Sequence, residues 1–519
     1  MMRAPRSILR KLRIEVESCD LSQQLDLCIE LANREPNISP ALRTALNLLF
    51  RTLKLLLDSF LTNSENSSLP PSADPGREPK RPKNSQSGRR PGAQPGHNGN
   101  NLGHETPTRT VELKVDRSKI PPDRTLTPEE PIRRQVYNIK ITREIIEYQA
   151  EVLVDQYGNR YVADFPPDVR AHAQYGNELK AYAVNLSVYQ LIPYERLASH
   201  LREWCNIPVA TGSIRNFIRD AAKRLQAFEI WLKTMLVMVW VLYTDVTSIN
   251  VSGKKKYIST YSSDKYTLLI PNEHKGHKAV IEVGILPNRT DDQIIMHDCD
   301  TTYFRYPGMH ALCGAHLLRD LRAVEEKDRV RWPIHMKKLL TEMVTEKTKP
   351  KEERSSYAYY RRRYRSILTK GENETKELKN RHKLSDGKDL KENITSETLL
   401  KRMRKYEDAY LRFYELEEVD FTNNLSERNL RHSKNRDKIS GCVKNMDSLD
   451  DICLIMSYIQ TCRNFGLTSE EALLRLFEGN LPEFIDLSQS DPSLFENQGV
   501  EDEKEEILDK SSEQKVVNM

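Results

Sequence analysis

Hydrophobic residues near the start of the chain recur at helical spacing. Between residues 41 and 61 they are separated by alternating steps of four and three, which places them on one face of a helix. We therefore predict that residues 1–63 are helical. An apolar face of this kind needs a partner, and a second helix of the same chain and a second copy in a coiled coil fit equally well. The residues of this face are Leu42, Leu46, Leu49, Leu53, Leu56 and Phe60.

The composition changes abruptly after residue 63. Residues 64–104 are rich in Ser, Asn, Pro and Gly, and beyond residue 76 six basic residues, among them Arg89 and Arg90, stand against one acidic residue. Such a segment cannot bury enough apolar surface to fold alone. It is either a solvated linker or a flexible arm that neutralises phosphates. We favour the arm, because one-sided charge repels itself unless a polyanion is near.

Two smaller regions follow the basic segment. Alternating polar and apolar positions in residues 105–165 predict a small antiparallel sheet. Residues 166–235 contain three helical segments, of which Pro193 begins the second and Thr211 or Ser213 caps the third. The short connections and the basic third segment fit a helix-turn-helix whose last helix lies in a DNA major groove. A plain three-helix bundle is the competing interpretation.

The hydrophobic period changes from helical to strand-like near residue 236. Three strand-like segments, a helix, a strand and a helix predict a mixed α/β layer over residues 236–329. Residues 330–420 are mostly helical and highly charged, and residues 421–485 form the last periodic block. Residues 486–519 carry ten acidic residues against three lysines, and we expect this tail to be disordered.

An arginine-rich run occupies residues 354–370, and no acidic residue interrupts it. Arginine-rich helices are often simply solvated. The absence of acids favours a nucleic-acid-binding face instead, with aromatic rings that pack on sugars or exposed bases. The central arginines and tyrosines of the run are Arg361, Arg362, Arg363, Arg365, Tyr357, Tyr359, Tyr360 and Tyr364.

The overall composition narrows the class of protein. The chain has 519 residues, which is too long for a single small binding module, and its longest apolar run is far too short to cross a bilayer. Eight cysteines without paired spacing argue against a disulfide framework, so we expect reduced thiols and a cytoplasmic location. The net charge is +5, and without the acidic tail it is about +12, which suits a polyanionic partner.

Two aspartates stand where apolar strands end. Asp245 follows VWVLYT and Asp298 follows QIIMH. Carboxylates on neighbouring strands repel each other unless a cation lies between them, and Mg²⁺ prefers oxygen ligands. A third acid is expected from another element, and Glu427 is the best candidate, because Lys434 lies seven residues further on the same helical face. Spacing alone favours an ordinary amphipathic helix there.

Several stretches, taken in order, resemble the DDE transposases of the bacterial insertion-sequence family sixty-six. They are NSENSSLPPSAD, GRRPGAQPGHNGNNL, YAVNLSVYQLIPYERLASHLRE, HDCDTTYFRYPGMHALCGAHLLRDL, KYEDAYLRFY and FTNNLSERNLRHSKNRDKISGCV with SYIQTCRNFG. The resemblance runs from about residue 63 to residue 479. Each stretch is weak alone, but their succession is specific.

The resemblance implies a multidomain α+β fold with a ribonuclease-H-like α/β catalytic core. Helical and small β domains would precede this core, and the helical insertion of residues 330–420 would interrupt it. The catalytic, metal-binding triad would be Asp245, Asp298 and Glu427. It would use Mg²⁺ or Mn²⁺ to cut transposon-end DNA and to align the freed 3′-hydroxyl for in-line attack on target DNA. A catalytically inactive DNA-binding protein derived from such a transposase is the alternative.

The resemblance also implies residues that assist the triad. Lys434 matches the basic residue that follows the catalytic glutamate, and Arg428, Arg431 and Lys438 accompany it as DNA-binding residues. His316, Arg319 and Asp320 would support the site, although Arg319 and Asp320 also fit a surface ion pair. The implied partners are transposon-end and target DNA, further copies of the chain and small accessory proteins, in a bacterial, nucleoid-associated setting.

The chain departs from the family pattern in ways that bear on metals. It reads Asp-Val-Thr-Ser from Asp245, where members carry Asp-Glu-Thr-Gly, and residues 105–165 contain no cysteine for the usual zinc ribbon. His310, Cys313 and His316 offer only three ligands, whereas structural zinc uses four. We therefore expect a packed cysteine and hydrogen-bonded histidines beside the site, and no zinc.

Overall fold

The computed structural model of the protein describes residues 21–34, 39–61, 102–124, 126–127, 129–386 and 395–495. The basic segment with Arg89 and Arg90 lies outside these residues, apart from its last few positions, and so does most of the acidic tail.

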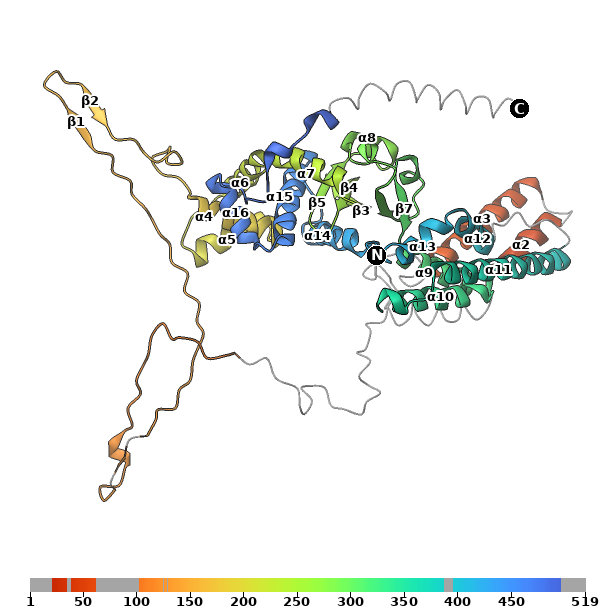
Figure 1. The fold of residues 1–519 in the computed structure, drawn as a ribbon, viewed down its shortest axis with the longest axis horizontal. Coiled ribbons are helices and arrows are strands. Elements are labelled where there is room, and N and C mark those ends of the chain that lie inside the picture. The colour runs from red at the N-terminus through yellow and green to blue at the C-terminus, as the bar shows by residue number, and fades with distance from the viewer. Residues whose placement is uncertain are drawn as a thin grey trace.

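A five-stranded mixed sheet forms the centre of the molecule (Figure 1). Its order is β5-β4-β3-β6-β7. Strands β3, β4 and β5 are antiparallel neighbours, whereas β6 runs parallel to β3 and β7 parallel to β6. This topology confirms the mixed α/β layer. The bounds are β3 Val241–Val251, β4 Lys254–Ser262, β5 Thr267–Asn272, β6 Ile294–His297 and β7 Met309–Leu312.

Local sequence explains the two kinds of strand. All four residues of β6 are buried, as expected for a parallel strand that is covered on both faces. The long β3 and β4 are joined by Ser252 and Gly253, which both have positive φ. Such a two-residue turn matches the twist of a hairpin, and glycine takes this conformation without steric cost.

One group of helices shares its hydrophobic core with the sheet. Helix α15 packs against β5, and α6 packs against α15. The helical region of residues 166–235 is therefore attached to the sheet through a continuous core instead of standing apart. This group consists of α4 Asn177–Val184, η3 Asn185–Tyr189, α5 Tyr194–Trp204, α6 Thr211–Arg224, α7 Gln226–Met238, α15 Met446–Asn464 and α16 Ser469–Glu478.

A second group of helices builds the insertion at the opposite end of the sheet (Figure 1). Its core includes buried residues of β6 and β7. Helix α8 His277–Val283 lies between β5 and β6 in the chain, and α14 Asn424–Ser440 packs on β3 and β4. The insertion consists of α10 Trp332–Lys347, α11 Tyr357–Asp386, α12 Thr395–Lys405 and α13 Glu407–Glu415, and α9 Gly314–Asp328 precedes it and packs against α10.

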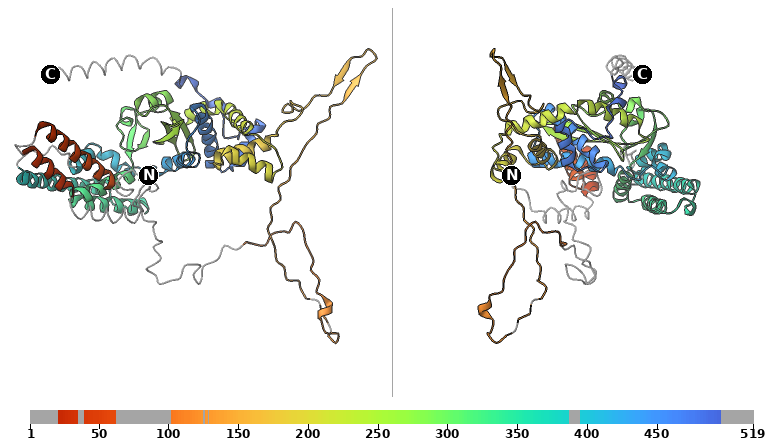
Figure 2. Two further views of the ribbon diagram at one scale, coloured as in Figure 1. Left: turned by 180° about the vertical axis from the view of Figure 1, so that it is seen from behind. Right: turned by 60° about the vertical axis from the view of Figure 1, so that its left-hand side comes forward.

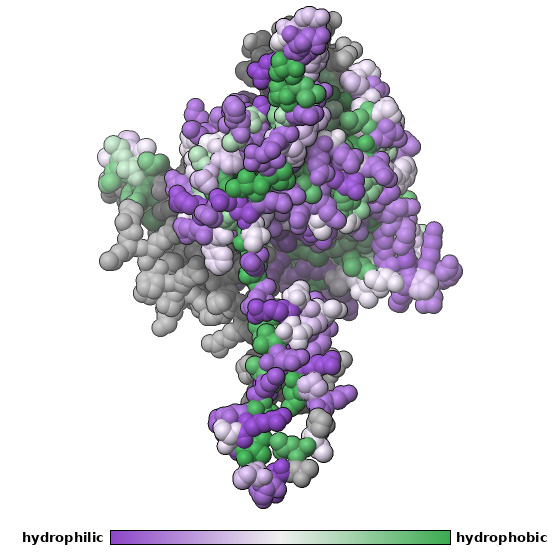
Figure 3. Space-filling view, turned by 90° about the vertical axis from the view of Figure 1, so that its left-hand side faces the viewer, coloured by the Kyte–Doolittle hydropathy of each residue, from purple (hydrophilic) through white to green (hydrophobic). Residues whose placement is uncertain are grey.

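The region of residues 105–165 contains less sheet than its pattern predicts. Its two strands, β1 Val152–Val154 and β2 Arg160–Val162, form a short hairpin, and a single 3₁₀ turn, η2 Arg117–Lys119, interrupts the remaining chain. In Figure 2 this region projects from the body, and in Figure 3 hydrophobic and polar side chains alternate along it. Alternation alone does not make a sheet, because no second layer covers the apolar side chains here.

The remaining helices and caps modify two further expectations. Near the N-terminus, α2 Leu21–Arg34 packs against α3 Pro40–Leu61. Leu42, Leu49 and Leu53 of the predicted apolar face remain exposed, so α2 covers that face only in part. Helix α6 begins at Thr211 after Ala210, and no side chain caps it, so the predicted cap by Thr211 or Ser213 is wrong. None of the helices described combines the length and the apolar character that a membrane span requires.

Candidate active site

Asp245 and Asp298 reach the same level on adjacent parallel strands. Tyr243 of β3 lies opposite Met296 of β6. Each aspartate lies two residues further along its own strand direction, so their side chains emerge side by side. Asp298 directly follows His297, the last residue of β6.

The pKa values of both aspartates are raised. Burial, together with the charges of Asp298 and Glu427, raises the pKa of Asp245 to about 7, although the N–H of Val246 opposes this by donating a hydrogen bond to its Oδ1 (2.8 Å). Burial also raises the pKa of Asp298, although the charges of Lys275 and His316 oppose this. Both shifts indicate a site that favours a bound cation.

Glu427 reaches this site from the first turn of α14. The helix is fixed by Asn423, whose Nδ2 donates a hydrogen bond to the carbonyl oxygen of Thr244 (2.8 Å), the residue before Asp245. The Glu427 charge acts on the pKa of Asp245, so the two carboxylates are within electrostatic reach. The structure thus brings together all three acids that the sequence singled out.

Two polar atoms beside the triad lack hydrogen-bond partners. Oε1 of Glu427 and Nδ1 of His316 are shielded from solvent, yet neither forms a hydrogen bond. They are 4.0 Å apart, and Nη2 of Arg319 lies 3.7 Å from the same oxygen. Buried polar atoms are normally paired, so this arrangement has room for a further positive charge. The donor set therefore fits a divalent cation.

The closest group of potential ligands is not the triad itself. Within the part of the chain that the structure describes, ligand atoms that all lie within 4.8 Å of one another belong to Cys313, His316 and Glu427. Glu427 is thus shared between an oxygen-rich group with the aspartates and a mixed group with a thiol and an imidazole.

Lys275 is a residue of the site that sequence reasoning missed. It lies in the loop before α8, and its Nζ is 3.0 Å from Oδ2 of Asp300. Burial lowers its pKa, but the hydrogen bond with Asp300 and the charges of Asp300, Asp298 and Asp245 outweigh this and raise it. No periodicity or spacing marks an isolated loop lysine, so the sequence held no signal for it.

The basic residues of α14 lie on its solvent side. Arg428, Arg431, Lys434 and Lys438 are all exposed. Arg428, Arg431 and Lys434 form no ion pair with any described residue. Arg436 on the same helix is buried and donates hydrogen bonds to the carbonyl oxygens of Ser187 (2.7 Å) and Val188 (3.1 Å). The four outer cations form an exposed basic stripe that begins beside Glu427.

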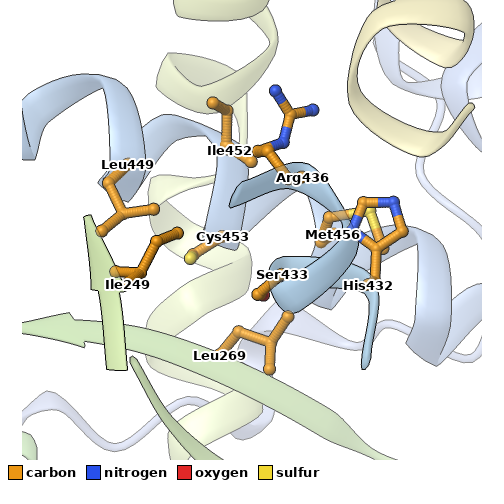
Figure 4. A pocket seen from close by; sticks show the side chains of 9 residues that line it. All are labelled: Ile249, Leu269, His432, Ser433, Arg436, Leu449, Ile452, Cys453 and Met456. Atoms are coloured by element: carbon orange, nitrogen blue, oxygen red, sulfur yellow. The ribbon is translucent and has the colours of Figure 1, made fainter. Parts of the chain in front are cut away.

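A small cavity lies on the inner side of α14 (Figure 4). Its volume is about 10 Å³, which is the space of a single water molecule. Ile249 of β3, Leu269 of β5 and Cys453 of α15 contribute to its mostly apolar lining. It is a packing defect under the helix and is too small for a substrate.

The arginine run of α11 is largely occupied by acids from other helices. Arg361 pairs with Glu407 (2.6 Å), and Arg365 pairs with the same carboxylate (2.8 Å). Arg363 pairs with Glu342 of α10 (2.6 Å). Among the four arginines named from the sequence, Arg362 is exposed and has no ion pair with a described residue.

The tyrosines of α11 correct the expectation of free aromatic rings. Tyr360 and Tyr364 are fully buried, Tyr357 is half-buried, and Tyr359 is 40% exposed. Residues 357, 360 and 364 follow helical spacing, and this places them on the face that packs into the insertion core. Their alternation with arginines reflects an amphipathic helix.

The residues of α9 separate into those that face the triad and those that do not. Arg319 and His316 contact Glu427, whereas Asp320 pairs with Arg402 of α12, so Arg319 and Asp320 do not pair with each other. Cys313 and His310 are packed and hydrogen-bonded as expected, whereas Nδ1 of His316 has no hydrogen-bond partner. Nε2 of His297 lies 3.1 Å from Nδ1 of His310, and the N–H of Asn423 donates to Sγ of Cys313 (3.2 Å).

Fold and site together define an α/β protein with an acidic centre at the ends of two parallel strands and an exposed basic helix beside it. The family model described as the Transposase IS66 family matches residues 172–450. This match spans more than half of the chain, and the chain belongs to that family. A second model, of a family of unknown function, matches residues 10–103. No curated protein matches the chain.

Proposed function

We propose that the protein is a divalent-metal-dependent DNA transposase whose catalytic residues are Asp245, Asp298 and Glu427. The observation that carries this proposal is the convergence of the three acids: the paired parallel strands β3 and β6 bring Asp245 and Asp298 to one edge of the sheet, and a hydrogen bond from Asn423 to β3 fixes the helix that carries Glu427. Family membership supports a DNA substrate. The mixed sheet is compatible with a ribonuclease-H-like core, in which β3 and β6 would deliver the two aspartates.

The triad would hold Mg²⁺ or Mn²⁺. In a two-metal site the ions are about 3.5–4 Å apart, so carboxylates on different ions need not lie within 4.8 Å of each other. When bound, the ions would supply Lewis-acid activation of the phosphodiester and of the attacking oxygen. The protein's own task is to aim three carboxylates at one point, and the Asn423 hydrogen bond to β3 supports this role.

The exposed stripe of Arg428, Arg431, Lys434 and Lys438 would hold the DNA backbone beside the triad. These side chains project from the same helix as Glu427, so a phosphodiester bound there lies next to the catalytic carboxylates. Arg362 is the residue of α11 whose charge remains available. For Arg361, Arg363 and Arg365 the ion pairs favour a structural role over DNA binding.

Helix α6 would read the transposon end. Its inner face packs on α4, α5 and α15, while Asn216, Arg219 and Lys223 are exposed and form no ion pair or hydrogen bond with any described residue. Arginine and asparagine are the side chains that most often recognise guanine and adenine in the major groove. This arrangement supports the helix-turn-helix interpretation over the plain bundle.

The test is cleavage of DNA from the inverted repeats that flank the gene, with and without Mg²⁺. Asp245→Asn, Asp298→Asn and Glu427→Gln should each lower the cleavage rate by at least about 10³-fold while they retain DNA binding. Asp264→Asn, at an exposed turn between β4 and β5, serves as the matched control and should cleave normally. If the wild-type protein binds the ends but never cuts them, the protein is a DNA-binding derivative of a transposase.

A further inference from the structure

Three side chains of different chemistry meet where α9 and α14 begin. Cys313 is the residue before α9, His316 lies in its first turn, and Glu427 lies in the first turn of α14. The thiol sulfur, one imidazole nitrogen and one carboxylate oxygen all lie within 4.8 Å of one another. Only small movements would bring all three to one metal ion, whose bonds to such ligands are about 2.0–2.3 Å long.

Two of these ligand atoms have unmet bonding capacity. Nδ1 of His316 and Oε1 of Glu427 are shielded from water and form no hydrogen bond. Their separation of 4.0 Å is too long for a hydrogen bond between them. The guanidinium of Arg319 compensates charge at 3.7 Å without a hydrogen bond to this oxygen. A cation bound to both atoms would satisfy them at once.

The third ligand is a buried thiol whose pKa is raised by burial, while nearby backbone N–H groups oppose this shift. Cys313 is buried, with 2% of its surface exposed, and the N–H of Asn423 donates to its sulfur. It also stands at the N-terminal end of the 15-residue helix α9, where the helix dipole favours negative charge. The sulfur joins the site through its position beside the two unpartnered atoms.

We propose that Cys313, His316 and Glu427 bind a thiophilic divalent cation of the zinc class, with water in the open fourth position. Zinc takes thiolate, imidazole and carboxylate ligands, whereas Mg²⁺ takes oxygen ligands and has little affinity for sulfur. On binding, the thiol releases its proton to water and the sulfur donates a lone pair to the metal.

This site regulates the transposase, a consequence that rests on the proposed function. Glu427 belongs both to this group and to the triad with Asp245 and Asp298. A zinc-class ion on Cys313 and His316 draws the carboxylate away from the aspartates, so the two metal classes compete. Free zinc is therefore an inhibitor of cleavage, even when Mg²⁺ is present in large excess.

The direct test is a titration of the full-length protein with Co²⁺, which replaces zinc and absorbs visible light. The wild-type protein should show a thiolate-to-cobalt charge-transfer band at one equivalent, and Zn²⁺ should abolish it. Cys313→Ser should lose the band, while Cys442→Ser, which alters an exposed cysteine, should keep it. His316→Ala and Glu427→Gln should each weaken Co²⁺ binding at least about tenfold, because even substitution of residues that only hydrogen-bond to a metal ligand weakens binding by this factor.

Each outcome decides the proposal. A wild-type protein without the band, or a Cys313→Ser protein that keeps it, overturns the assignment. Circular dichroism of Cys313→Ser checks that it folds, and His316→Ala gives an independent readout if it does not. In cleavage assays with excess Mg²⁺, Zn²⁺ should inhibit the wild-type protein more than His316→Ala. A failure of cleavage itself would contradict the proposed function but would leave the Co²⁺ result standing.

Discussion

At the scale of single residues, the folded protein disfavours the ionised form of Asp245. Its pKa of about 7 means that the carboxyl keeps its proton in the folded protein over a range where the unfolded chain has lost it. The folded state therefore binds this proton more tightly than the unfolded state does. The free energy of unfolding falls as pH rises from about 4 to about 7 and is constant above that range, as far as this group is concerned.

Asp245→Asn should therefore stabilise the metal-free protein at pH 8. The amide carries no charge, so the gain is up to about 4 kcal/mol above pH 7 and disappears toward pH 4. Thermal unfolding in EDTA at both pH values measures this difference. Mg²⁺ should then raise the Tm of the wild-type protein but not of the variant. A variant that is less stable than the wild-type protein at pH 8 without metal would contradict the account.

The residues of the site differ in how far the sequence predicts them. Asp245 and Asp298 follow apolar strands, and that position alone indicates a rigid carboxylate at the edge of a sheet. Glu427 could be identified as catalytic only from the resemblance to the transposase family, because its local spacing is that of any amphipathic helix. Lys275 and the sharing of Glu427 with Cys313 depend on contacts across the fold, which local patterns do not encode.

At the scale of elements, the start of α9 is pressed against the segment that leads into α14. The N–H of Gly314 donates to the carbonyl oxygen of Phe421 (2.8 Å), and a Cβ at Gly314 would lie 2.2 Å from the Phe421 ring. Asn423 follows two residues later and fixes α14 to β3. Glycine at this position thus allows the close approach that places Glu427.

Gly314→Ala should displace this contact and damage the site. The overlap cannot be relieved without movement of backbone or of the Phe421 ring, so we expect a loss of about 1–3 kcal/mol in the free energy of unfolding and slower cleavage. Denaturant unfolding measures the first effect. Gly212→Ala in α6 is the control, since nothing lies within 4 Å of its Cβ and its stability should be unchanged or slightly higher. If Gly314→Ala were as stable as Gly212→Ala, the close approach of Gly314 to Phe421 would not matter for stability.

Elements with a clear period were predictable, and those that depend on a second layer were not. Strands β3, β4, β5 and β6 and helices α8 and α9 follow from apolar spacing, whereas the short β7 was not among the predicted strands. Residues 105–165 alternate just as well, but a short hairpin is the only sheet they form in the described structure, because sheet formation needs a covering partner. In α11 the acids that neutralise the arginines come from α10 and α13, which a scan along one helix does not see.

At the scale of the whole molecule, the distribution of charge matters more than the net charge of +5. Arg361, Arg363 and Arg365 of α11 are paired with acids. In contrast, Arg428, Arg431 and Lys434 of α14 and Arg219 and Lys223 of α6 are exposed and form no ion pair with a described residue. The two open surfaces are joined, because Arg436 of α14 donates to the carbonyl oxygens of Ser187 and Val188 in η3, which follows α4. DNA bound to α6 and DNA bound to α14 would thus be held by the same folded unit of the protein.

The double variant Arg431→Ala/Lys434→Ala should bind DNA more weakly and with less dependence on salt. Loss of two phosphate contacts should reduce the slope of log affinity against log salt by about 2. Fluorescence anisotropy over a range of salt concentrations measures this slope. Arg363→Ala should leave the slope unchanged and lower stability instead, because its partner is Glu342. If Arg363→Ala reduced the salt slope and the double variant did not, the DNA-binding surface would lie on α11 instead of α14.

The central claim is that three distant acids share one metal centre, and anomalous diffraction from crystals grown with Mn²⁺ tests it most directly. We expect Mn²⁺ density in contact with the carboxylates of both Asp245 and Asp298, with Glu427 as a further ligand at the same centre. Loss of this density in Asp245→Asn would support the account. Mn²⁺ density away from both aspartates, or its persistence in the variant, would contradict it.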